Sequence, residues 1–272
     1  MTITEKYQKL KEYLASLESV AIAFSGGVDS TLLLRTAHDV LGDKAVAMTL
    51  FSSFFPHRDF LEASKFCAEN KIRLIMCPVD SLTIEGIKEN PRNRCYLCKK
   101  DLFTRLLARA KENNLACVAE GSNVDDVTDF RPGMKAIDEL GIKSPLRAAG
   151  LHKNEIRELS KSLGLPTWNK PSFACLASRF VYGEQINKEK LKMVEDAEQL
   201  LMDLGFKQFR VRIHGKIARI EILPEDFEKI IQEKIRVKIH EDLRSLGFSY
   251  VTLDLKGYRT GSMNEVIDEV KD

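Results

Sequence analysis

Residues 20–30 read VAIAFSGGVDS, and this stretch decides the fold. Its first part, VAIAF, is an apolar run without polar alternation, which is typical of a strand buried on both faces. Two glycines flanked by serines follow directly, and residues 31–41 have the apolar spacing of a helix. The stretch therefore predicts a strand, a glycine-rich turn and a helix in immediate succession.

The glycine-rich turn is suited to binding phosphate. Gly26 and Gly27 let the backbone approach an anion without a Cβ in the way. N–H groups at the start of the following helix have no intrahelical partner and point at the anion, and Ser25 and Ser30 add hydroxyl donors. A Walker A loop requires a lysine after its last glycine, where this chain has Val28. A plain strand-to-helix turn, the alternative, needs one glycine and a cap rather than two glycines between serines.

The alternation of strand and helix continues through the first half of the chain. Strands are predicted at residues 45–50, 72–77 and 115–119, and helices at residues 57–70 and 98–113. Apolar strands separated by helices indicate an α/β fold with a parallel sheet covered on both faces. Ligands on such sheets usually lie at the carboxyl ends of the strands.

The pattern changes in the second half of the chain. A helix at residues 152–163 is followed by residues 166–185, which have no clear period and which we interpret as an active-site loop. After a helix at residues 188–204, the order strand, strand, helix, strand predicts a smaller α+β domain with an antiparallel pair. We therefore expect a first domain over residues 1–165 and a second over residues 166–272.

Composition restricts the class of protein. Hydrophobic residues make up 44% of the chain and charged residues 30%, near the globular average, and 42 Lys+Arg against 40 Asp+Glu leave a net charge of +2. No stretch approaches the roughly 18 apolar residues of a membrane span, and the charged N-terminus is not a signal peptide. Six cysteines without a secretory signal indicate a reducing compartment. We expect a cytoplasmic protein with no membrane partner.

The motif Ser-Gly-Gly-x-Asp-Ser at residues 25–30 resembles the pyrophosphate loop of the PP-loop ATP pyrophosphatases. The resemblance implies a Rossmann-like first domain that splits ATP between its α- and β-phosphates. AMP is left on an acceptor oxygen and pyrophosphate is released. It also implies that Asp29 helps to hold the Mg²⁺ that neutralises the pyrophosphate.

Later segments narrow the resemblance to the LarE family of ATP-dependent sulfur transferases. They follow the family's order along the chain, at residues 120–126, 131–133, 144–147, 174–180, 210–214 and 257–264. The resemblance implies that a carboxylate of pyridinium-3,5-biscarboxylic acid mononucleotide is adenylylated and that sulfur then replaces AMP, giving a thiocarboxylate. Two such steps supply the sulfurs of the nickel-pincer nucleotide cofactor of lactate racemase. A homo-oligomer, such as a hexamer, is also implied.

Arginines are expected around such a substrate, because it carries a phosphate and carboxylates. Arg210 and Arg212 lie two apart on a predicted strand and so project from one face, although a solvated sheet face gives the same pattern. By resemblance, Ser178 and Arg179 join them around the substrate phosphate. Gly121 and Asp125 follow a predicted strand and suit a nucleotide contact, with a polar surface turn as the alternative.

Three cysteines stand in segments suited to chemistry. Cys95 and Cys98 form a CxxC pair in a basic, proline-marked loop opening a helix, where thiolates are favoured. Cys175 stands alone in the predicted active-site loop. A structural zinc site needs four ligands, and neither a second CxxC nor a histidine pair accompanies the first. A redox dithiol leaves Cys175 without a role. Three thiolates can hold three irons of a 4Fe–4S cluster and leave the fourth open to sulfide, so we predict this cluster.

Three alternatives remain open. In the sacrificial LarE type, which lacks the CxxC, the lone cysteine gives up its own sulfur, and Cys175 can do the same. A PP-loop tRNA thiolase is the second alternative, because basic residues gather between Lys88 and Arg105, although the net charge of +2 and the lack of a visible RNA-binding module argue against tRNA. A regulatory module that binds ATP without chemistry is the third, and it has no need of the CxxC. The sequence does not define the sulfur donor, sulfide or another source.

Overall fold

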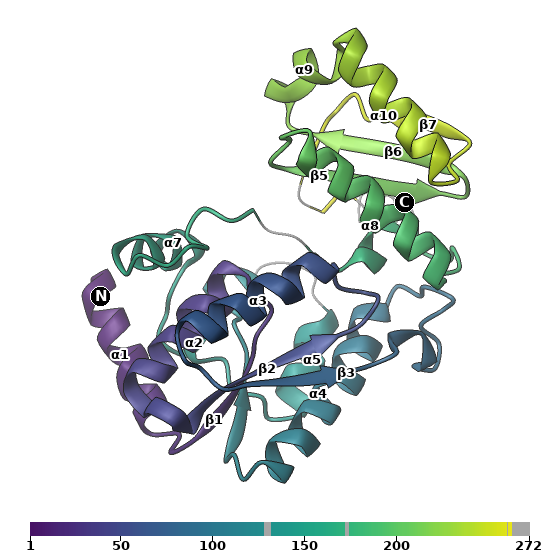
Figure 1. The fold of residues 1–272 in the computed structure, drawn as a ribbon. Coiled ribbons are helices and arrows are strands. Elements are labelled where there is room, and N and C mark those ends of the chain that lie inside the picture. The colour runs from purple at the N-terminus through teal and green to yellow at the C-terminus, as the bar shows by residue number, and fades with distance from the viewer. Residues whose placement is uncertain (128–131, 172–173, 260, 263–272) are drawn as a thin grey trace, which may run out of the picture. The chain divides into compact units, whose positions relative to one another are not determined.

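The computed structural model describes residues 1–127, 132–171, 174–259 and 261–262 (Figure 1). Arg131 and residues 260, 263 and 264, which belong to LarE-like segments, lie outside the described residues. The chain divides into two compact units. The first consists of Met1–Ile84 and Asn93–Phe173, and the second of Glu85–Arg92 and Ala174–Asp272.

A four-stranded parallel sheet forms the centre of the first unit, in the order β3-β2-β1-β4. The strands are β1 Val20–Ala23, β2 Ala45–Phe51, β3 Leu74–Pro78 and β4 Cys117–Ala119. In register, Val20 pairs with Ala45 on one side and with Cys117 on the other. The predicted parallel sheet is confirmed, and the two strands nearest the chain start begin at the expected residues.

Helices cover both faces of this sheet, which is why its strands carry no polar alternation (Figure 1). On one face lie α1 Ile3–Ala15, α2 Val28–Leu41, α3 His57–Glu69, α6 Pro145–Ala148 and α7 Lys153–Ser162. On the other face lie α4 Arg94–Glu112 and α5 Pro132–Glu139. The strand alternation divides β1 between the two cores, since Val20 and Ile22 face the first set of helices and Ala21 faces the second.

Two helices begin earlier than the sequence predicts. Helix α2 begins at Val28 rather than at residue 31, so Asp29 belongs to its first turn. Helix α4 begins at Arg94 rather than at residue 98, so Cys95 and Cys98 both lie within the helix and not in a loop before it. The reason is local, because the leucine and lysines that follow Arg94 are good helix formers and the nearest proline lies before the helix.

A three-stranded sheet in the order β5-β6-β7 forms the centre of the second unit. Strands β5 Phe209–His214 and β6 Ile217–Ile222 pair antiparallel, as the sequence predicts, and β7 Tyr250–Leu253 pairs parallel with β6. Helix α8 Lys188–Asp203 packs against β5, and α10 Glu233–Ser245 packs against α8 and β7. The short helix α9 Phe227–Ile231 precedes α10.

The segment Glu85–Arg92 belongs to the second unit although the residues on both sides of it belong to the first. Asn90 is fully buried and donates from Nδ2 to the carbonyls of Phe180 and Val181, at 3.3 and 2.7 Å. The backbone N–H of Ile186 donates to the carbonyl of Lys88 at 2.8 Å. This short segment is therefore an integral part of the second unit.

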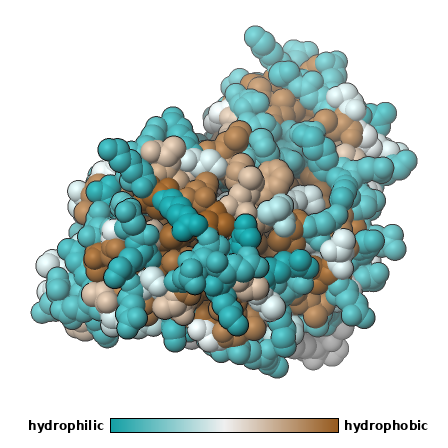
Figure 2. All heavy atoms as spheres, turned by 60° about the horizontal axis from the view of Figure 1, so that its bottom comes forward, coloured by the Kyte–Doolittle hydropathy of each residue, from teal (hydrophilic) through white to brown (hydrophobic). Residues whose placement is uncertain are grey.

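Hydrophilic residues are spread over the face shown in Figure 2, with apolar residues in smaller areas between them. Large exposed apolar side chains, such as Leu61, Met76 and Tyr250, lie on different elements. Single apolar side chains of this kind are common on folded proteins. In the parts of the chain that the structure describes, no helix is both long and apolar enough to cross a membrane.

Candidate active site

The phosphate loop, residues 25–30, joins the carboxyl end of β1 to the start of α2. Gly26 has a φ of 69°, a left-handed conformation that glycine adopts without strain. Gly27 is the N-cap of α2 and has no side-chain cap, so the first N–H groups of the helix are available to a ligand. The hydroxyl of Ser30 lies 3.1 Å from that of Ser25 and donates to the Gly27 carbonyl at 3.2 Å. The loop thus presents backbone and hydroxyl donors at a helix N-terminus, the arrangement of an anion site.

A second loop, residues 120–126, follows β4 and packs on the start of α2. A Cβ on Gly121 would lie 3.1 Å from the Ser30 nitrogen and 3.3 Å from the Asp29 Cβ, so a side chain there would push the two loops apart. Asn123 Nδ2 donates to Asp29 Oδ1 at 3.3 Å. The two loops therefore approach each other closely at Gly121.

Glu120 fixes the base of this second loop. Its carboxylate is buried and accepts hydrogen bonds from the hydroxyls of Ser122 and Ser144, at 2.7 and 2.6 Å. Its backbone N–H donates to the Lys143 carbonyl at 2.9 Å. Glu120 therefore links two of the LarE-like segments, those at residues 120–126 and 144–147.

The start of α7 joins Asp29 and Asp125, two acidic residues that the sequence places in the site. Lys153 Nζ forms an ion pair with the Asp29 carboxylate. The Lys153 backbone N–H donates to Asp125 Oδ2 at 2.7 Å, and His152 Nδ1 lies 2.7 Å from Asp125 Oδ1. These bonds, first that from Lys153 and then that from His152, lower the pKa of Asp125. Lys153 is thus a cation at the phosphate loop that the sequence pattern did not single out.

Cys95 and Cys98 lie in the first two turns of α4. Residues three apart share a face of a helix, so the two thiols are presented together. Both are half-buried and neither forms a disulfide, and Arg94 Nη2 lies 3.9 Å from Cys95 Sγ. Helix α5 approaches the same turn closely, because a Cβ on Gly133 would lie 3.3 Å from the Cys95 carbonyl oxygen. The pair fits two thiolate ligands of a metal centre.

The third predicted ligand, Cys175, belongs to the second unit, whereas the CxxC pair belongs to the first. Among the described residues, no group of three or more His, Cys, Asp and Glu side chains is arranged to hold a metal ion. The three-cysteine ligand set therefore stays a prediction.

Arg179 holds the loop that carries Cys175. Its guanidinium is fully buried and donates from Nε and Nη2 to the two carboxylate oxygens of Glu198 on α8, each at 2.8 Å. Its Nη1 donates to the carbonyls of Ala174 and Cys175, at 2.8 and 3.1 Å. Burial alone would raise the pKa of Glu198, but the charge and hydrogen bonds of Arg179 outweigh burial and lower it. The contacts of Arg179 thus fix the backbone at Cys175 to α8.

Arg212 connects the Cys175 loop to the sheet of the second unit. It donates from Nε and Nη2 to the two carboxylate oxygens of Glu221 on β6, at 3.1 and 3.0 Å. Its Nη1 donates to the Ser178 carbonyl at 2.9 Å, and its Nη2 also donates to the Ser262 hydroxyl at 2.9 Å. Arg212 therefore ties the backbone at Ser178 to β5 and β6.

Arg210 projects from the same face of β5 as Arg212 and is 4% exposed. Its guanidinium lies 5.1 Å from the centre of the Tyr258 ring, within cation–π range. Burial, followed by the charge of Arg179, lowers the pKa of Arg210 to about 10. A cation that is buried beside other arginines is a group that an anionic ligand would stabilise.

Apart from the CxxC pair, the predicted site residues fall into two sets, one in each unit. The structure brings together, in the first unit, Ser25, Gly26, Gly27, Asp29, Ser30, Gly121 and Asp125. In the second unit it brings together Cys175, Ser178, Arg179, Arg210 and Arg212. Their roles in binding and catalysis stay predictions.

A parallel sheet with a glycine-rich loop between its first strand and the following helix is typical of nucleotide-binding α/β proteins. No protein-family model matches the chain. The pyridinium-3,5-bisthiocarboxylic acid mononucleotide synthase of Lactiplantibacillus plantarum is 38% identical over 271 residues, 99% of this chain and 98% of its own. The chain therefore belongs to the family of that enzyme, the LarE family.

Two further relatives are similar over most of this chain. An uncharacterised protein of Synechocystis is 39% identical over 265 residues, 97% of this chain and 99% of its own. A glutamine-hydrolyzing GMP synthase chain from Methanoculleus marisnigri is 26% identical over 240 residues, 76% of this chain and 77% of its own. Similarity to GMP synthase supports the PP-loop superfamily that residues 25–30 indicate.

Proposed function

We propose that this protein is an ATP-dependent sulfur transferase acting on pyridinium-3,5-biscarboxylic acid mononucleotide. It adenylylates a carboxylate of this substrate and converts it to a thiocarboxylate for nickel-pincer nucleotide synthesis. The observation that carries the proposal is the full-length relation, 38% identity over 99% of the chain, to a synthase named for the bisthiocarboxylate product. The phosphate loop supports it, because the reaction consumes ATP.

The first unit supplies the adenylylation step. A substrate carboxylate oxygen attacks the α-phosphorus of ATP, the bond from that phosphorus to the bridging oxygen breaks, and pyrophosphate leaves. The backbone donors at Gly27 and the Ser25 and Ser30 hydroxyls bind the departing phosphates. Asp29 offers a carboxylate at the same loop, an oxygen ligand suited to Mg²⁺, which would neutralise the pyrophosphate charge when bound. Lys153, which pairs with Asp29, adds a further positive charge there.

Adenylylation makes the second step possible. A carboxylate is a poor electrophile, but its mixed anhydride with AMP has a good leaving group. A sulfur nucleophile attacks the acyl carbon, the bond to the AMP oxygen breaks, and the thiocarboxylate forms. Arg210 and Arg212, buried on one face of β5, are proposed to bind the substrate phosphate with Ser178. Arg179 acts through its bonds to the Cys175 loop.

We further propose that Cys95, Cys98 and Cys175 hold a 4Fe–4S cluster. When bound, such a cluster supplies an iron open to sulfide, and sulfide is the sulfur source that fits it. Support comes from the shared helix face of Cys95 and Cys98 and from the backbone bonds that fix Cys175. Sacrificial loss of sulfur from Cys175 is the competing route, in which the CxxC pair has no part.

The adenylylation test uses purified protein with ATP, Mg²⁺ and the biscarboxylic mononucleotide. Pyrophosphate and the acyl-adenylate should form in equal amounts, and when sulfide is supplied the acyl-adenylate should become a thiocarboxylate and release one AMP for each pyrophosphate. Asp29→Asn should lower AMP formation by at least about a hundredfold. Asp39→Asn, at an exposed residue of the same helix that pairs with Arg35, is the matched control and should leave the rate unchanged. Release of ADP would contradict the proposal.

The cluster test uses anaerobic purification followed by iron and sulfide analysis. About four irons are expected in each chain. Replacement of Cys95, Cys98 or Cys175 by serine should remove sulfur transfer and leave ATP binding intact, whereas Cys67→Ser, at a buried thiol, should retain the iron. An iron-free protein that loses the mass of one sulfur from Cys175 on turnover would establish the sacrificial route instead.

The basic residues between Lys88 and Arg105 give little support to the tRNA alternative. Within the first unit, Lys100 forms an ion pair with Glu139 and Arg105 with Asp101, so part of this charge is compensated locally. Salt-dependent tRNA binding would favour that alternative. We propose instead that residues 1–165 bind ATP and that residues 166–272 bind the small-molecule substrate and form a homo-oligomer in the cytoplasm.

A further inference from the structure

Lys170 contacts the phosphate loop. Its Nζ donates to the Gly26 carbonyl at 3.1 Å and to two carboxylates of α3, Asp59 Oδ1 at 3.3 Å and Glu62 Oε2 at 2.7 Å. The side chain is 17% exposed. An ammonium group has three donors, and the three acceptors use them all. Lys170 therefore ties the loop to the first turns of α3.

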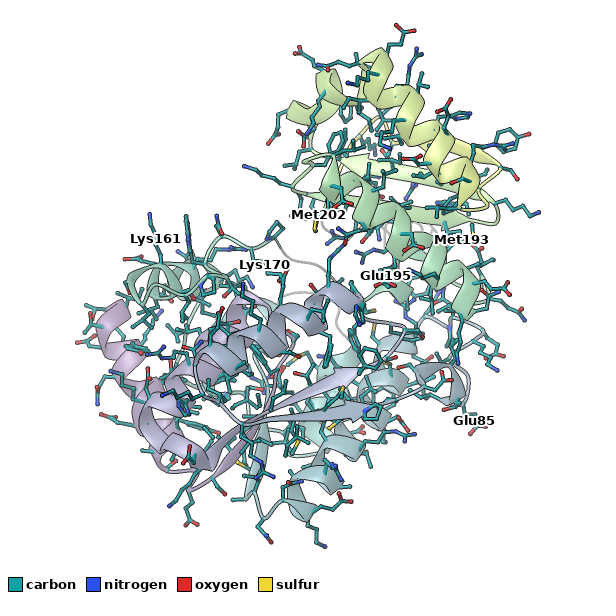
Figure 3. The ribbon with its side chains drawn as sticks, in the orientation of Figure 1. Glu85, Lys161, Lys170, Met193, Glu195 and Met202 are labelled. Atoms are coloured by element: carbon teal, nitrogen blue, oxygen red, sulfur yellow. The ribbon has the colours of Figure 1, made fainter. Side chains whose placement is uncertain are left out.

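The backbone at Lys170 is itself held in place. Arg157 of α7 donates from Nη1 to the Trp168 carbonyl at 2.8 Å and from Nη2 to the Lys170 carbonyl at 2.9 Å. The Lys170 N–H donates to the Thr167 carbonyl at 2.9 Å. Lys170 follows α7, whose last turn carries Lys161, and both lysines are labelled in Figure 3. The ammonium of Lys170 is thus presented to the loop from a turn anchored on α7.

The loop needs such an anchor because of its two glycines. The Gly26 carbonyl and the Gly27 N–H belong to one planar trans peptide and point in opposite directions. Holding the carbonyl at Lys170 directs the Gly27 N–H to the other side, where it donates to Ser25 Oγ at 3.4 Å. A peptide between two glycines meets little steric resistance to turning over, since neither residue has a Cβ. Turned over, it would present a carbonyl oxygen to the anion.

We propose that Lys170 is a positioning residue that keeps the Gly26–Gly27 peptide in its phosphate-binding orientation. It touches no reacting atom and acts through the Gly26 carbonyl, while its charge offsets Asp59 and Glu62 beside an anion site. The proposal rests on the proposed function in one respect, that the loop binds the phosphates of ATP.

The test compares binding of Mg²⁺-pyrophosphate with binding of AMP, by titration calorimetry, and follows thermal unfolding in parallel. Lys170→Met removes the donors and the charge, and pyrophosphate affinity should fall by about tenfold. AMP affinity should be unchanged, because AMP leaves the pyrophosphate position empty. Lys170→Gln keeps a donor without the charge and should fall between the wild type and Lys170→Met. Lys161→Met is the matched control, since Lys161 is exposed and contacts the Trp168 ring; it should bind as the wild type does.

Three outcomes would overturn the proposal: wild-type pyrophosphate affinity in Lys170→Met, an equal loss for AMP, or an equal loss in Lys161→Met. If Lys170→Met does not fold, Lys170→Gln decides by the same comparison of the two ligands. Failure of the proposed function is distinguishable, because it would appear as wild-type protein that binds pyrophosphate but releases no AMP from ATP.

Discussion

Replacing Glu198 by glutamine removes the counter-charge of Arg179 inside the second unit. Both side chains are 0% exposed, and the Glu198 carboxylate also accepts the Val211 N–H at 3.1 Å. Glutamine offers Arg179 one oxygen in place of two, so the ionic attraction and one of two 2.8 Å bonds are lost while the guanidinium stays buried. Removing one partner of a buried pair costs about 3–5 kcal/mol, and the bond that remains places the cost of Glu198→Gln at the lower end of this range.

Urea unfolding of a double-mutant cycle measures this loss. Glu198→Gln, Arg179→Met and the double variant should give a coupling energy of about 2 kcal/mol or more, because neither partner is costly once the other charge has gone. Asp196→Asn on α8, which disrupts an exposed ion pair with Lys192, should cost less than about 1 kcal/mol. In Glu198→Gln, Cys175 should also be alkylated faster by iodoacetamide, because Arg179, with one bond to α8 lost, holds the Cys175 backbone less firmly. A loss below about 1 kcal/mol, or strictly additive single variants, would refute this reasoning.

Three further predictions concern other parts of the two units. Gly121→Ala should weaken ATP binding several-fold in calorimetry with little change in thermal midpoint, since its Cβ would lie 3.1 Å from the Ser30 nitrogen; unchanged binding would show that the two loops can separate freely. Lys153→Met should lower steady-state AMP formation by about tenfold, because the cation at Asp29 is lost. A wild-type rate would show that Lys153 has no role in the reaction. Burial, and after it the charge of Arg219, lowers the pKa of His214 in the folded protein. The contribution of His214 to the free energy of unfolding is therefore fully present above its unfolded pKa of about 6.5, and it is lost as the pH falls through the folded pKa. The thermal midpoint should therefore fall more between about pH 8 and about pH 5 in the wild type than in His214→Gln, and equal losses would contradict this assignment.

The features that the sequence pattern predicted are local ones. The apolar run at residues 20–24 and the glycines after it are contiguous, so strand, loop and helix could be read in order. The antiparallel pair at β5 and β6 is likewise joined by a tight turn, in which Gly215 has a φ of 60°. Helix starts were less accurate, as α4 shows, because Arg94 and Cys95 carry no strong start signal.

Contacts between distant residues could not be predicted from one sequence. Lys153 and Asp29 are 124 residues apart, and a lysine at the start of a predicted helix carries no sign of its partner. The burial of Glu198 could not be predicted for the same reason. A glutamate in an amphipathic helix is normally solvated, and Glu198 is buried because it pairs with Arg179 from a preceding segment of the chain. Pattern shows which face of an element is apolar, whereas the pairing of a buried charge depends on the assembled fold.

The assignment of Glu85–Arg92 to the second unit has a consequence for biosynthesis. During translation this segment leaves the ribosome before most of the second unit has been made, because Phe180 and Val181, which accept hydrogen bonds from Asn90, are synthesised about ninety residues later. The nascent chain must therefore carry Asn90 before two of its acceptors, the carbonyls of Phe180 and Val181, have been synthesised. For the same reason, a gene fragment that begins at residue 174 would encode a second unit that lacks the segment Glu85–Arg92. Separate expression of the two units would require the segment to be supplied again, joined to the fragment or added as a peptide.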